Sequence, residues 1–173
     1  MASDPGPHET DAYRICFVCT GATCRSPIAQ AVFAAIVDRA GYSGAVEITA
    51  AGVGDWHLGK CADPRALAAL TRHGYPPLEH RARQFDPDWF ASLDLVVAID
   101  RSQERMLRAW AATPADRGKV RRLGFFDPES ADLGDPTHPV RGDDAAFDEV
   151  VERIERAGAL LFRHIEPELR PHD

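Results

Sequence analysis

Residues 19–27 read Cys19-Thr20-Gly21-Ala22-Thr23-Cys24-Arg25-Ser26-Pro27 and follow the apolar run Arg14-Ile15-Cys16-Phe17-Val18. The apolar run predicts a buried strand, and Pro27 begins a stretch to Ala40 with apolar residues at helical spacing. A strand, a short loop of small residues and a helix start gather backbone N–H groups where anions bind. This order predicts a phosphate-binding loop after the first strand of an α/β domain.

Three side chains of this loop carry the predicted chemistry. Arg25 has a planar fork that matches two phosphate oxygens. The converging donors also favour the thiolate form of Cys19, which would face a bound phosphoryl group for in-line attack. Ser26 precedes a proline at the expected start of the helix, so we predict that it caps this helix. We expect phosphate or another oxyanion to bind along the loop, at Thr20, Gly21, Ala22, Thr23 and Cys24.

The rest of the chain alternates apolar β-formers with amphipathic stretches, which is typical of a parallel sheet. Further strands are predicted at residues 46–50, 93–99 and 120–125, and further helices at residues 64–73, at residues 102–110 and from Asp143 onward. The predicted fold is a single-domain, doubly wound sheet of about four parallel strands with helices on both faces. We assign residues 13–173 to this domain and residues 1–12 to a disordered acidic segment.

Composition restricts the class of protein further. The net charge of −7 argues against a nucleic-acid surface, which needs clustered Lys and Arg. No apolar run reaches the ~18 residues of a membrane span, and we expect a cytoplasmic protein. Four cysteines, three of them crowded, make a poor disulfide framework. Cys16 and Cys19 would point to opposite faces of a strand, so we expect no metal site and no organic cofactor.

Several segments together resemble the low-molecular-weight protein tyrosine phosphatases, and in particular the bacterial ones. The Cys-x5-Arg-Ser-Pro loop is one of them. The others are Ala51-Gly52-Val53-Gly54-Asp55-Trp56-His57-Leu58-Gly59, Asp63-Pro64-Arg65-Ala66, His73-Gly74-Tyr75-Pro76 and His80-Arg81-Ala82-Arg83-Gln84. The resemblance spans most of the chain and implies hydrolysis of protein phosphotyrosine through a phosphocysteine.

The resemblance also assigns residues outside the loop. It implies that Asp135 of Asp135-Pro136 protonates the leaving aryl oxide and then activates water; Asp127-Pro128 is expected to be only a turn. Trp56 resembles the family's aromatic wall, and it could stack on the substrate ring or belong to the core. Thr137 and His138 occupy the positions that contact the substrate. Ser26 could also donate to the Cys19 thiolate. Cys24 could pair with Cys19 under oxidation or be an inert small hydrophobe.

The chain departs from the family pattern in three ways. Ala22 stands where the family has a left-handed Asn, and Ala50 appears to replace the Ser that bonds it, while His80 matches the third partner. If Ala22 must still adopt the left-handed conformation, it costs roughly 1–2 kcal/mol more than a residue with local bonding, and we hypothesise a less rigid loop that phosphate organises. Thr23 resembles the protein arginine phosphatases, and Thr137-His138 replaces aromatic residues, which leaves the choice of substrate open.

Several functions therefore compete. We expect a protein tyrosine phosphatase acting on a phosphorylated protein, with a protein arginine phosphatase as the alternative. Arsenate reduction is disfavoured, because no cysteine follows Cys61 to form a relay. A different class is a phospho-ligand binding or redox-sensing module with little turnover. Asp135 discriminates against that class, since a pure binder has no use for a general acid.

Overall fold

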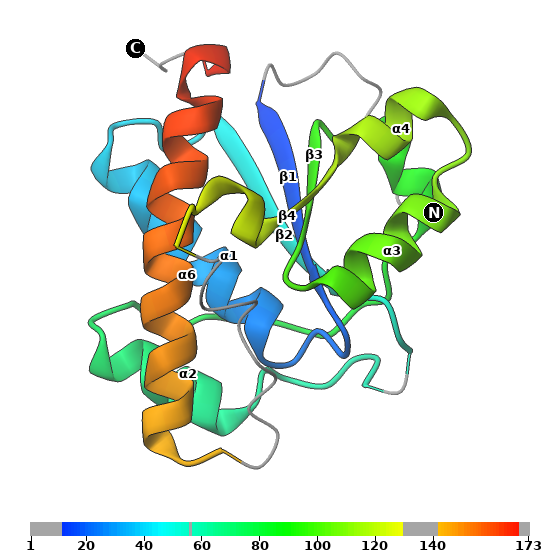
Figure 1. Ribbon diagram of the computed structural model, residues 1–173. Helices are drawn as coiled ribbons and strands as arrows, with labels where there is room; N and C mark the ends of the chain where they lie inside the picture. Colours follow the sequence, from blue (N-terminus) through cyan, green and yellow to red (C-terminus); the bar gives the residue numbers. More distant parts are fainter. Residues whose placement is uncertain (1–11, 56, 130–141, 170–173) are drawn as a thin grey trace.

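The apolar runs form one parallel sheet. The computed structural model describes residues 12–55, 57–129 and 142–169. Its strands are β1 (Tyr13–Cys19), β2 (Val46–Gly52), β3 (Leu95–Ala98) and β4 (Val120–Arg122), hydrogen-bonded in the order β2-β1-β3-β4. All three pairings are parallel. The chain winds outward from the centre in both directions, so the predicted doubly wound α/β fold is confirmed (Figure 1).

Helices cover both faces of this sheet (Figure 1). One face packs against α1 (Arg25–Arg39), α2 (Pro64–Arg72) and the long α6 (Asp144–Ile165). The other packs against α3 (Arg101–Trp110) and the 3₁₀ helix η1 (Pro87–Ala91), with α4 (Pro114–Lys119) beside α3. Because successive side chains of a strand alternate, Cys19 faces the first layer and Cys16 the second, as predicted.

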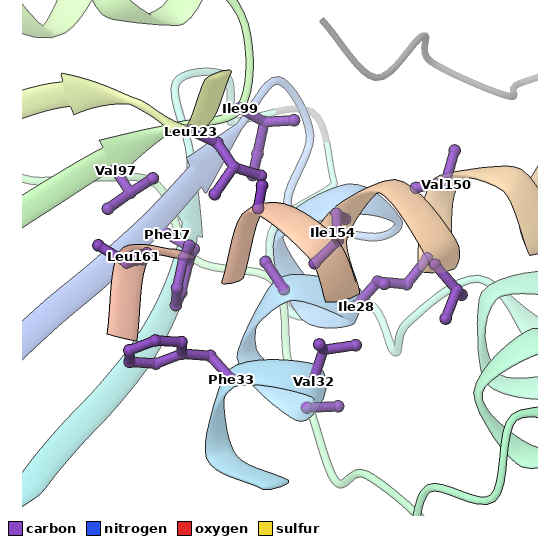
Figure 2. Packing of buried hydrophobic residues seen from close by; sticks show 14 of the residues in the cluster. Phe17, Ile28, Val32, Phe33, Val97, Ile99, Leu123, Val150, Ile154 and Leu161 are labelled. Atoms are coloured by element: carbon purple, nitrogen blue, oxygen red, sulfur yellow. The ribbon is translucent and has the colours of Figure 1, made fainter. Parts of the chain in front are cut away.

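The larger core lies between β1, α1 and α6, as Figure 2 shows. Phe17 of β1 meets Phe33 of α1 edge to face, with ring centroids 5.5 Å apart. Gly158 allows α6 to lie close to α1, since a Cβ at this position would lie 3.2 Å from the Ile36 side chain of α1. This packing fixes the start of α1 against the end of β1, which is where the predicted phosphate loop lies.

Some predicted elements differ from the observed ones. The strand predicted at 120–125 ends at Arg122, and a 3₁₀ helix, η2 (Leu123–Phe126), follows. Sequence patterns also missed η1 and α4, which are short, although each begins with a capping side chain before a proline. A last 3₁₀ helix, η3, spans Glu166–Glu168. No helix in the described parts of the chain is long and apolar enough to cross a membrane.

Candidate active site

The loop of residues 19–25 lies at the carboxyl end of β1, in the centre of the sheet. The chain turns one way from β1 to β2 and the other way from β3 to β4, so β1 and β3 border the topological switch point. Open α/β sheets bind ligands in the crevice at such a point. Asp100 lies two residues after the end of β3 and therefore beside this loop.

The backbone carbonyls of the loop point outward, toward neighbouring segments. The carbonyls of Cys19, Thr20, Ala22 and Thr23 accept hydrogen bonds from Val53 N, Gly54 N, His80 Nε2 and Asp63 N, respectively. A trans peptide holds each carbonyl and the next N–H on opposite sides, and the described chain has no cis bond. The N–H groups that follow these carbonyls therefore point toward the inside of the loop. They form a cradle for the oxygens of an anion.

The start of α1 adds to this cradle. The helix begins at Arg25, its N-cap is Cys24, and no side chain caps it. The prediction that Ser26 is the N-cap was therefore wrong. Ser26 lies within the first helical turn, which tolerates Pro27 because an N–H there has no partner within the helix. The first-turn N–H groups thus carry no side-chain cap and face the site that an anion would occupy.

Cys19 and Ser26 are brought together at the base of the loop. Their Sγ and Oγ atoms lie 3.1 Å apart, and both residues are buried. A serine hydroxyl at this distance can donate to a thiolate. Burial together with the neighbouring Cys19 raises the pKa of the Cys24 thiol to about 12. Cys24 is therefore a protonated thiol at neutral pH and no rival nucleophile.

Arg25 is almost fully buried, with 2% of its side chain exposed, and it pairs with Asp100. Its Nη1 donates to Asp100 Oδ2 at 2.9 Å. Burial by itself would raise the pKa of Asp100, but the hydrogen bond and charge of Arg25 outweigh it. Arg25 and the backbone N–H groups of Gln103 and Ser102 together hold the pKa of Asp100 below its usual value. Asp100 stays ionised at neutral pH and fixes the guanidinium beside the loop.

Sequence reasoning missed Asp100 and Gln103. Asp100 caps α3 in a capping box with Gln103, whose fully buried side chain also donates to Thr20 Oγ1 at 2.9 Å. Asp100 Oδ2 thus accepts from both Arg25 and Gln103. The signal was present, because an Asp-x-x-Gln pattern directly follows the apolar strand. Helix α3 is in this way attached to the phosphate loop at two points.

The unusual residue Ala22 adopts the left-handed conformation that the family's Asn takes at this position, with φ of 60°. His80 Nε2 lies 2.5 Å from the Ala22 carbonyl, so this nitrogen carries the proton. Burial, aided by Arg83, lowers the pKa of His80 although the carbonyl bond opposes it. A cavity of about 240 Å³ adjoins Ala50 and His80. Ala50 therefore lines a space beside the histidine that contacts the strained residue.

We predict that restoring polar partners stabilises this loop. In the double variant Ala22→Asn/Ala50→Ser, the free energy of unfolding should rise by about 1 kcal/mol, because Asn tolerates a left-handed backbone. Phosphate affinity should rise as well, since a preorganised loop loses less entropy on binding. Urea unfolding and calorimetry measure the two. Ala22→Val is the opposite control and should destabilise; an unchanged or less stable double variant contradicts the prediction.

Two glycines allow other segments to lie against the loop. A Cβ on Gly21 would lie 2.6 Å from Cδ2 of His57, so the imidazole packs directly on the loop. Sequence reasoning gave His57 no role of its own, and it missed this contact. A Cβ on Gly52, at the end of β2, would lie 2.7 Å from the Thr20 carbonyl oxygen. The segment after β2 therefore forms one side of the site.

Four predicted site residues lie outside the described residues: Trp56, Asp135, Thr137 and His138. Asp127, the expected turn residue, is buried and accepts from the Glu129 N–H and from Arg156 Nε. Within the described ranges, no three His, Cys, Asp or Glu side chains are grouped to hold a metal ion. The fold and the loop together define an α/β protein with an oxyanion cradle at its switch point.

Comparison with known proteins identifies the family. The family model for low molecular weight phosphotyrosine protein phosphatases matches residues 14–170. The low molecular weight protein-tyrosine-phosphatase of Streptomyces coelicolor is 50% identical over 152 residues, covering 87% of this chain and 92% of that protein. Low molecular weight protein-tyrosine phosphatase A of Mycobacterium tuberculosis is 44% identical over 149 residues, with coverage of 86% and 88%. The chain therefore belongs to the low molecular weight phosphotyrosine protein phosphatase family.

Solved structures agree with this assignment. YfkJ from Bacillus subtilis has a TM-score of 0.83 at 29% identity, covering 91% of this chain and 96% of that chain. The YwlE arginine phosphatase has a TM-score of 0.78 at 28% identity, with coverage of 88% and 95%. The resemblance drawn from the sequence motifs is confirmed, and the chain is an enzyme of the hydrolase class.

Proposed function

We propose that this enzyme hydrolyses phosphotyrosine in proteins through a phosphocysteine intermediate on Cys19. One observation carries the proposal: a buried cysteine with a serine oxygen at 3.1 Å lies at the base of a loop with inward N–H groups. The names of the relatives, with identities up to 50%, support phosphotyrosine as the substrate.

The first step is attack of the Cys19 thiolate on phosphorus. The S–P bond forms as the bond to the tyrosine oxygen breaks, and the three other phosphate oxygens stay in the cradle. The Arg25 guanidinium donates to these oxygens. Its Nη1 also donates to Asp100, and this bond keeps the guanidinium in place. Asp135 gives its proton to the leaving oxygen, a contribution of about 10²–10⁴-fold.

The second step returns the enzyme to its starting state. Asp135, now a carboxylate, takes a proton from a water molecule that attacks the phosphocysteine, and phosphate leaves with the Cys19 thiolate restored. The Ser26 hydroxyl stabilises this thiolate as the leaving group. The reaction needs no metal or organic cofactor. We further propose that Trp56, Thr137 and His138 contact the residue that carries the phosphoryl group.

A specific observation favours a second substrate, phosphoarginine. Thr23 departs from the tyrosine pattern, and a structural neighbour is named an arginine phosphatase. Three further proposals concern ligands and location. The site also binds free oxyanions such as phosphate, and the acidic chain binds no nucleic acid. The enzyme is located in the cytoplasm. Its nucleophile must stay reduced, which fits a reducing compartment. Oxidation would join Cys19 to Cys24 reversibly.

Matched peptides that carry phosphotyrosine or phosphoarginine in one sequence test the substrate. We expect kcat/KM for the phosphotyrosine peptide to be at least about tenfold higher, because the relatives named for phosphotyrosine are much more similar in sequence. Thr23→Ile should widen this ratio if Thr23 favours arginine. A preference for phosphoarginine overturns the proposed substrate and leaves the cysteine mechanism in place.

A further inference from the structure

Gln103 is a fully buried polar side chain, and its oxygen serves the start of α3. Oε1 accepts from the Asp100 backbone N–H at 2.8 Å, which completes the capping box of this helix. A glutamate would complete the box equally well, because the motif needs only a side-chain oxygen at this position. The cap therefore explains the oxygen of Gln103 and leaves its amide nitrogen unexplained.

The amide nitrogen of Gln103 donates to two side chains that come from different parts of the site. Nε2 lies 2.9 Å from Thr20 Oγ1 and 3.1 Å from Asp100 Oδ2. An amide nitrogen carries two hydrogens, so both of them are used. The amide can be placed in one orientation only, since its oxygen must face the Asp100 N–H. A glutamate carboxylate could make neither donation.

These two bonds connect the Gln103 amide to both ends of the phosphate loop. Thr20 is the second residue of the loop, and its N–H belongs to the inward-facing cradle. At the other end, Arg25 Nη1 donates at 2.9 Å to the same Asp100 oxygen that accepts from Gln103. Arg25 and the amide nitrogen can only donate, so Asp100 Oδ2 must accept from both. Burial makes this arrangement strict, because a buried donor without an acceptor is costly.

We propose that Gln103 is a positioning residue for binding of the phosphoryl group. Its amide nitrogen holds Thr20 and, through Asp100, the Arg25 guanidinium at the separation that one phosphoryl group requires. This inference rests on the role of Arg25 in the proposed function. Positioning of this kind matters because a displacement of about 1 Å can lower a rate by roughly 10²-fold.

The substitution Gln103→Glu separates the two roles of this side chain. It keeps an oxygen for the cap, removes both donations and places a second carboxyl group beside Asp100. We expect kcat/KM at about pH 8 to fall by about tenfold to 10²-fold. The loss should be equal on phenyl phosphate and 4-nitrophenyl phosphate, because it concerns the phosphoryl group and not the leaving group. Affinity for inorganic phosphate, measured by titration calorimetry, should fall in parallel.

The pH profile of Gln103→Glu is a readout that a purely structural role would not change. Among the described contacts of Gln103, Asp100 is the charged partner, and Asp100 is itself paired with Arg25. Burial and the charge of Asp100 should raise the pKa of a carboxyl group introduced at this position. At lower pH the group is protonated, and its O–H can donate once. Relative to wild type at the same pH, the loss should shrink by at least about threefold from about pH 8 to about pH 5.

Gln30 of α1 provides the matched control. This glutamine also bonds across the fold, with Nε2 3.2 Å from the Ile48 carbonyl, and none of its described contacts reaches Thr20 or Asp100. Gln30→Glu should therefore keep kcat/KM within about twofold of wild type at either pH. Urea unfolding of both variants separates a loss of stability from a loss of activity.

Thr20→Val tests the line from its other end, because it removes one acceptor of the amide and keeps the shape of the side chain. This variant should lose at least about threefold in kcat/KM, and it replaces Gln103→Glu if that variant does not fold. Combined with Gln103→Glu, it should cost less than the product of the two single losses, since both break the same bond.

The contrary outcomes separate this inference from the proposed function. A loss below about threefold for Gln103→Glu, or for Thr20→Val in its place, overturns the inference alone. A loss that does not change with pH, or single losses that simply multiply, overturn it as well. If Arg25→Lys retains most of the activity, the role of Arg25 in the proposed function fails and this inference fails with it.

Discussion

Cys19→Ser should abolish turnover, with kcat below roughly one ten-thousandth of the wild-type value. A serine hydroxyl is far less ionised than a thiol at neutral pH, and no histidine base adjoins Cys19 in the contacts of the described residues. The cradle of N–H groups does not involve the side chain that is changed. The variant should therefore still bind phosphate, as a rise of its melting temperature with added phosphate would reveal.

A second cysteine of the same strand is the matched control. Cys16 lies three residues away, fully buried on the opposite face of β1, where burial raises its pKa to about 11. Cys16→Ala should lower stability through the lost packing and leave kcat within about threefold. Mass spectrometry of wild type during turnover should show one added phosphoryl group on Cys19. Turnover that survives Cys19→Ser would refute the covalent mechanism.

Arg25→Lys should lower kcat/KM by roughly 10³-fold, although it keeps the positive charge. The lysine ammonium can pair with Asp100, but it cannot hold Asp100 and two phosphate oxygens in one plane. Phosphate affinity should fall in parallel, as isothermal titration calorimetry measures. Because Arg25 is buried against the loop, the loss should appear on every phosphate ester, whatever its leaving group.

The variant Asp100→Asn distinguishes the contribution of the Arg25 guanidinium from that of its partner Asp100. This variant leaves the Arg25 guanidinium in place but removes its charged partner, so the loss in kcat/KM should be smaller than for Arg25→Lys. Added phosphate should recover part of the lost stability, because it supplies the missing anion.

The Arg25 prediction has a clear contrary outcome. If Arg25→Lys keeps more than a tenth of the wild-type activity, the planar guanidinium of Arg25 is not what binds the phosphoryl group.

Local patterns predicted the fold well, for identifiable reasons. β1 and β3 are largely apolar runs, and α2 and α6 have helical spacing with Asp63 and Asp143 as caps. The failures concern short elements and helix starts. The end of β4 was placed too late because Leu123 is apolar in a 3₁₀ turn as it would be in a strand. Ser26 was placed outside α1 because Pro27 marked the helix start too late.

The candidate site also contains some residues that the sequence predicted and others that only the tertiary structure brings together. The sequence by itself determined the nucleophile loop, because nine consecutive residues contain the thiol, the guanidinium and the start of a helix. The sequence left open whether Ala22 adopts the left-handed conformation of the family's Asn, and the structure shows that it does. Only the tertiary structure could bring in Asp100, Gln103 and His57, which lie between 38 and 84 residues after Cys19 in the sequence.

The physical reason is that parallel strands place their carboxyl ends side by side, whatever their separation along the chain. Asp100 reads in the sequence as a helix cap, and only the adjacency of β1 and β3 makes it the partner of Arg25. Arg65 likewise reads as one more charge on an amphipathic helix. Its hydrogen bond to the Gly142 carbonyl exists because α2 packs against α6.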